Sequence, residues 1–93
     1  MKLNFSAKID DIEVRTCDIY LCKSGKHVTA EIIKWENGSC YTLAYWKKDG
    51  EGYYLKFVGR RPFDNCDKDT FWILADFGQY YLDLFFESED YYV

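Results

Sequence analysis

The sequence predicts an α+β domain in which an antiparallel β-meander of four to six strands packs against one C-terminal amphipathic helix. Three turn signals, Ser24-Gly25, Asn37-Gly38 and Asp49-Gly50, divide the first part of the chain into hairpin arms. Apolar and polar residues alternate along these arms, as they do on strands with one buried face. After Pro62 the apolar residues recur with a helical period instead.

The first expected element is an N-terminal strand. Apolar residues alternate with polar ones from Leu3 to Ile9 and onward to Val14, and the phase changes before Cys17. A bulge or turn near Thr16 would account for this change of phase. The residues alone do not identify the partner of this strand.

The turn residues of the first two hairpins predict their pairing. Two-residue loops at the first two signals pair Leu21 with Val28 and Ile32 with Leu43.

At the third signal we expect a three-residue loop over 48–50, with Gly50 in the left-handed conformation, which pairs Tyr45 with Tyr53. A loop of even length would place Lys56 on the core face. The predicted core face is apolar or aromatic throughout: Cys17, Ile19, Leu21, Val28, Ala30, Ile32, Tyr41, Leu43, Tyr45, Tyr53, Leu55 and Phe57.

A helix is predicted over 67–88, with Asp67 or Asp69 as its N-cap. The predicted buried arc, which Ile73 and Leu84 flank, consists of Phe71, Leu74, Phe77, Gly78, Tyr81, Leu82 and Phe85. Gly78 lies on this arc although Gly costs ~1 kcal/mol relative to Ala in a helix. Its presence indicates a close approach of the helix backbone to the sheet.

The charge is distributed unevenly along the chain. Residues 1–62, the sheet region, hold eleven Lys and Arg against eight Asp and Glu, whereas residues 63–93 hold one Lys against eight acids. We interpret 1–93 as a single domain that ends in an acidic and aromatic tail over 89–93. Nineteen aromatic residues are more than a core of this size can hide, so some are expected on the surface.

The expected location is the cytoplasm. The N-terminal residues lack the apolar segment of a signal peptide, and no apolar run approaches the ~18–20 residues that span a bilayer, so no membrane partner is expected. The four cysteines, which we expect to be reduced, are Cys17, Cys22, Cys40 and Cys66.

Candidate catalytic and metal-binding groups are weak, so we predict neither an enzyme nor a cofactor or metal. The single histidine, His27, is expected on the outer sheet face without an orienting group. Cys17 and Cys22 lie at a spacing that zinc sites use, but the chain offers no second pair. Asp64, Asp67 and Asp69 lack the glycine and glutamate of a calcium loop, and helix capping explains them better.

The preferred functional hypothesis is a non-enzymatic protein-binding module that uses the solvent arc of the helix. An exposed Trp beside aligned carboxylates suits an interface in which the Trp anchors binding and the acids attract a basic partner. Such a protein could inhibit or regulate a nucleic-acid-handling factor. The residues predicted to carry this role are Trp72, Asp76, Gln79, Asp83 and Glu87.

The alternative hypothesis is a single-stranded nucleic-acid-binding domain that uses the outer sheet face. Aromatic rings would stack on bases while cations follow the phosphates. The residues predicted for this role are Trp35, Trp46, Tyr54, Lys56 and Arg60. Two further interpretations of this face stay open, namely that the N-terminal strand covers it or that two chains pair there as a homodimer.

Overall fold

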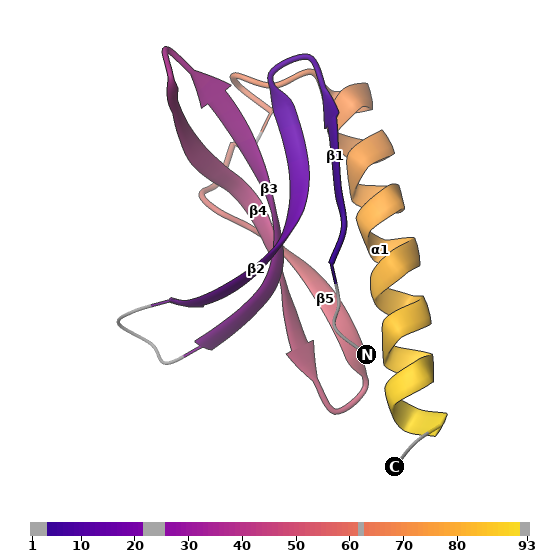
Figure 1. Ribbon diagram of the computed structural model, residues 1–93. Helices are drawn as coiled ribbons and strands as arrows, with labels where there is room; N and C mark the ends of the chain where they lie inside the picture. Colours follow the sequence, from indigo (N-terminus) through magenta and orange to yellow (C-terminus); the bar gives the residue numbers. More distant parts are fainter. Residues whose placement is uncertain (1–3, 22–25, 62, 92–93) are drawn as a thin grey trace.

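Five antiparallel strands form one sheet in sequence order, and one helix lies along one face of it, with β1 beside the helix (Figure 1). The computed structural model describes residues 4–21, 26–61 and 63–91. The elements are β1 (Ser6–Ile9), β2 (Ile12–Leu21), β3 (Lys26–Glu36), β4 (Ser39–Asp49), β5 (Gly52–Phe57) and α1 (Lys68–Tyr91). The predicted fold class, an α+β meander with a C-terminal helix, is confirmed.

The N-terminal strand pairs with the strand that follows it. Ala7 lies opposite Val14, and Asp10 occupies the left-handed region in the turn between β1 and β2, with φ of 54°. The register of β2 against β3 shifts between Thr16 and Ile19, which confirms the bulge expected near Thr16.

The β2–β3 hairpin differs from its predicted pairing by two residues. Val28 pairs with Ile19 rather than with Leu21. A register shift of two residues keeps the alternation of the two faces, because strand side chains alternate with a period of two. The two-residue loop predicted at Ser24-Gly25 lies outside the described residues.

The β3–β4 hairpin contains the predicted turn and an unpredicted bulge. Asn37 and Gly38 have φ of 53° and 82°, the positive values that a two-residue type I′ turn requires. Further along, however, Ile32 pairs with Ala44, and Leu43 is the extra residue of a bulge. The predicted pairing of Ile32 with Leu43 is therefore wrong.

The bulge reverses the faces of the second half of β4, and the β4–β5 loop is one residue shorter than predicted. Asp49 pairs with Gly52, so the connection is a two-residue loop rather than the predicted three-residue loop over 48–50. Tyr45 now pairs with Lys56 on the face away from α1, and Trp46 pairs with Leu55 on the face toward α1. The inward placement of Tyr45 was wrong because the prediction assumed unbroken alternation along β4.

The core lies between α1 and the sheet. Its largest fully buried side chains include Ile12, Val14, Ile32, Trp46, Phe71, Leu74 and Leu82. At Gly78 the helix backbone approaches the sheet so closely that an added Cβ would lie 2.7 Å from Cη2 of Trp46 and 3.1 Å from Cγ2 of Val14. The predicted reason for a glycine on the buried arc is confirmed.

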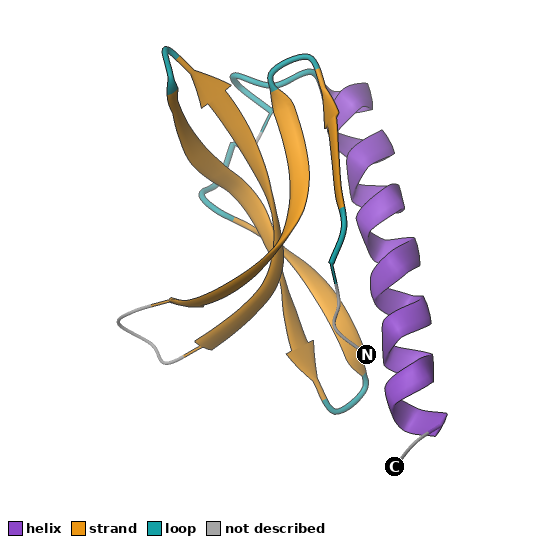
Figure 2. Cartoon of the chain, viewed as in Figure 1, coloured by secondary structure: helices purple, strands orange, loops and turns teal. Residues whose placement is uncertain are grey.

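The helix begins with the Asp67 cap and extends beyond its predicted end. The backbone N–H and the hydroxyl of Thr70 each donate to Oδ2 of Asp67 at 2.9 Å, so Asp67 rather than Asp69 is the N-cap. At its other end α1 continues to Tyr91, so the backbone of 89–91, predicted as tail, is helical (Figure 2).

Candidate protein-interaction surface

Apolar side chains project from the side of α1 that faces away from the sheet. Ile73 is 59% exposed, Tyr80 61% and Leu84 46%. Their spacing places them on one side of a helix with 3.6 residues per turn. No other element of the described chain lies against this side (Figure 2). We call the surface formed by the exposed residues of α1 from Asp69 to Glu87 the outer face of α1.

Carboxylates accompany the apolar side chains on the outer face. Asp69, Asp76, Asp83 and Glu87 are all exposed. The sequence contains no Lys, Arg or His after Lys68, the first residue of α1, so no cation further along the helix offsets their charge. The outer face is therefore both apolar and negatively charged, a combination that attracts cationic groups.

Trp72 lies at the border between the outer face and β5. Its indole is 38% exposed and packs with ring centroids 6.0 Å from Phe57, 6.1 Å from Phe63 and 5.2 Å from Phe71. The ring is thus held on one side by an aromatic cluster and open on the other. The structure places Trp72 where the sequence predicted an exposed Trp, but its ring also helps to close the end of the core.

Gln79 does not belong to the solvent arc on which it was predicted. Its Oε1 accepts from Nε1 of the buried Trp46 at 2.8 Å, and its Nε2 donates to the Tyr53 carbonyl at 3.3 Å. The same Nε2 donates to Oδ1 of Asp83 at 2.9 Å. Because a buried indole N–H needs an acceptor, the side chain of Gln79 turns toward the sheet. From there its amide also binds Asp83, which lies on the outer face.

Sequence reasoning missed the apolar part of the outer face. It treated Ile73 and Leu84 as flanks of the buried arc and assigned no role to Tyr80. The signal was present in the spacing, because 73, 80 and 84 lie roughly opposite the buried residues Phe71 and Leu82 on a helical projection. Because α1 carries aromatic and aliphatic side chains around most of its circumference, the sequence alone did not define where the buried arc ends.

On the outer sheet face, the placement of Trp46 was wrong. Its side chain is 0% exposed and lies on the opposite face, under α1. Tyr54, Lys56 and Arg60 are exposed as predicted. A stacking platform for bases needs several open rings on one face, so the loss of Trp46 weakens the nucleic-acid interpretation.

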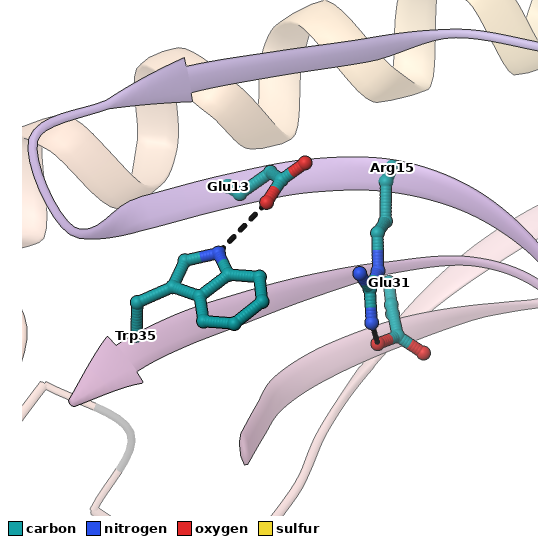
Figure 3. A network of polar contacts seen from close by, with 4 residues as sticks. All are labelled: Glu13, Arg15, Glu31 and Trp35. Atoms are coloured by element: carbon teal, nitrogen blue, oxygen red, sulfur yellow. Dashed lines mark hydrogen bonds and ion pairs between the residues drawn. The ribbon is translucent and has the colours of Figure 1, made fainter. Parts of the chain in front are cut away.

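The remaining tryptophan of that set is engaged in contacts within the sheet. Trp35 is half-buried, and its Nε1 donates to Oε1 of Glu13 at 2.8 Å (Figure 3). Lys8 lies over the same indole at 5.9 Å from its centroid. Beside them, Arg15 forms an ion pair with the buried Glu31 at 3.4 Å (Figure 3). The Arg15–Glu31 pair neutralises two charges on this part of the face, and the Trp35 indole is engaged on its N–H edge and on its ring face.

The groups considered for catalysis or metal binding do not gather in the described residues. No set of three His, Cys, Asp or Glu side chains comes together there in a metal-binding arrangement. Burial raises the pKa of the Cys66 thiol, with Asp11 and Asp67 acting in the same direction and Lys34 opposing them. The side chain of His27 lies outside the described part of the structure.

Comparisons with known proteins add no functional assignment. No family model, curated protein sequence or solved structure shows a significant match to this chain. Within the described residues, no helix combines the length and the apolar character that crossing a membrane requires.

Proposed function

We propose that this protein is a non-enzymatic binding module that recognises a protein with a basic surface through the outer face of α1. The observation that carries the proposal is the combination of exposed Ile73, Tyr80 and Leu84 with neighbouring exposed carboxylates and no cation on the helix beyond Lys68. Apolar and aromatic side chains at the centre of an interface supply most of its affinity. Charges at its rim steer the encounter and exclude partners of the same sign.

The partner class that best fits the outer face is a factor that handles nucleic acid. Such a factor carries a cationic groove that holds phosphates. A row of helix carboxylates offers that groove the same charge, and the apolar side chains between them add contacts that a phosphate backbone lacks. On this proposal the protein acts as an inhibitor or regulator that competes with nucleic acid for the groove.

The test starts with affinity capture and uses variants that leave the core intact. Among the described residues, Tyr80 makes a ring contact only with its neighbour Tyr81, and Asp76 makes no hydrogen bond or ion pair, so both can be changed without loss of core contacts. Trp72 and Asp83 are less suitable, because one packs on Phe57 and the other on Gln79.

A captured protein is purified and its affinity is measured for wild type, Tyr80→Ala and Asp76→Lys by calorimetry. Loss of a central aromatic anchor typically costs ~2 kcal/mol, which corresponds to a roughly 30-fold weaker Kd. The matched control is Glu36→Lys, the same charge change at the exposed last residue of β3. Unchanged affinity for both outer-face variants would rule out the proposal.

A further inference from the structure

The residues of the outer face repeat with the heptad period of packed helices. Asp69, Asp76 and Asp83 are exposed and recur every seven residues, and Asp90 continues the spacing in the sequence. Beside this row the apolar residues recur at intervals of four, three and four: Ile73, Phe77, Tyr80 and Leu84. In a coiled coil these apolar residues would occupy the a and d positions, and every aspartate would occupy g.

This apolar stripe is available to a partner rather than used by the sheet. Ile73, Tyr80 and Leu84 are exposed, and only Phe77 is half-buried, because its ring packs against Phe5 at 5.9 Å. From Ile73 to Leu84 the stripe extends over three helical turns, about 16 Å. The residues of the buried arc lie on the opposite side of α1 and already pack against the sheet in the core.

We propose that the outer face of α1 binds an amphipathic helix of the partner, with apolar residues packed on the stripe and Lys or Arg facing the aspartate row. This inference rests on the proposed function and specifies the form of its partner. The g positions of packed helices select partners by charge, so three aspartates at g require cations opposite them.

The charge pattern argues against a second copy of this chain as the occupant. An antiparallel pair of α1 helices would place the aspartate row against the same row, with like charges facing each other. A parallel pair would place it against the other flank, where Leu74 and Tyr81 stand. Neither arrangement supplies a cation.

The spacing also selects a helix over an extended segment. A helix repeats its side chains every seven residues, or about 10.5 Å, so one register aligns cations with all three aspartates. An extended chain presents side chains on one side every two residues, about 6.6 Å. This repeat does not match the spacing of about 10.5 Å between the aspartates, so its side chains fall out of step with the aspartates after the first.

The experiment uses three fluorescein-labelled synthetic peptides of four heptads with Leu at a and d. The first carries Lys at e and g, the second carries Glu there, and the third is a scrambled sequence with the composition of the first. Anisotropy titrations at near-physiological salt measure the Kd of each for the full chain. We expect the Lys peptide to bind at least tenfold more tightly than the scrambled peptide, and the Glu peptide not to bind.

Two sets of variants separate packing from general charge attraction. Ile73→Ala with Leu84→Ala removes exposed side chains only, and it should weaken the Lys peptide about tenfold or more. Asp69→Lys with Asp76→Lys should transfer the preference to the Glu peptide. The same charge change at the exposed Glu36 and Glu51, in the β3–β4 and β4–β5 hairpins, should leave the preference unchanged.

Equal binding of the Lys and scrambled peptides would overturn the inference, because it would show attraction by charge without helix packing. The proposed function would survive that result if a captured protein still depended on Tyr80 and Asp76. Reversed preference in the Glu36 and Glu51 control would also overturn the inference, since the outer face would then not be the site.

Discussion

Substitution of Gly78 by Ala tests the closest approach between α1 and the sheet. An added Cβ would lie 2.7 Å from Cη2 and 3.1 Å from Cζ2 of Trp46, well inside the ~3.5–4.0 Å at which carbon atoms pack. Trp46 cannot easily move aside, because it is fully buried and its indole N–H is bonded to Gln79. The helix must therefore shift away from the sheet.

Two opposing terms determine the sign of the effect. Ala is favoured over Gly in a helix by ~1 kcal/mol. Overpacking of a well-filled core costs ~1–3 kcal/mol, and a contact almost 1 Å too short belongs near the upper end of that range. The expected net result for Gly78→Ala is a loss of about 2 kcal/mol in the free energy of unfolding, or a melting temperature lower by roughly 8–16 °C.

The assay is urea and thermal unfolding followed by circular dichroism, with a double-mutant cycle as the control. Trp46→Phe removes the two ring carbons that the new methyl would meet. In that background Gly78→Ala should cost far less, and the coupling energy between the two sites should reach ~1–3 kcal/mol. If Gly78→Ala stabilises the protein, or costs the same in both backgrounds, the assignment of the clash to Trp46 is refuted.

Three further outcomes follow from single contacts. Gln79→Leu should cost ~1–3 kcal/mol in urea unfolding, because the buried indole loses its acceptor, and a similar loss for Asp83→Ala would contradict this. Hydrogen bonds from Thr70 lower the pKa of the Asp67 carboxyl in the folded protein below the ordinary value of 3.8. The ionised carboxylate therefore stabilises the folded state above pH 3.8, and this contribution is lost as the pH falls through the pKa of the folded protein. Asp67→Asn should remove that part of the acid-induced fall in melting temperature, and an unchanged pH profile would count against it. Because burial raises the pKa of Cys66, iodoacetamide should alkylate the exposed Cys40 first, and mass spectrometry showing Cys66 modified first would exclude this explanation.

The candidate surface could be predicted only in part. Trp72 and Asp76 are exposed on the helix as the sequence indicated, because a helical period distinguishes an outward residue from an inward one. Gln79 lies at the border of the buried arc, where the period alone cannot decide. Its orientation depends on an indole that needs an acceptor and that lies 33 residues away in the sequence.

The succession of hairpin arms, the Asn37-Gly38 turn, the helix with an aspartate cap and the close approach at Gly78 all followed from the sequence. Each of these depends on residues that are neighbours in the chain or on the steric freedom of a single residue, so local physical chemistry is sufficient. Only the tertiary structure decided that the bulge at Leu43 turns Trp46 inward. A bulge changes the phase of every residue after it, and its position depends on which pairing buries the most apolar surface across the whole sheet. The same non-local competition left Ile73, Tyr80 and Leu84 on the outer face, because the sheet offers one face to α1 and the other apolar residues of the helix already fill it.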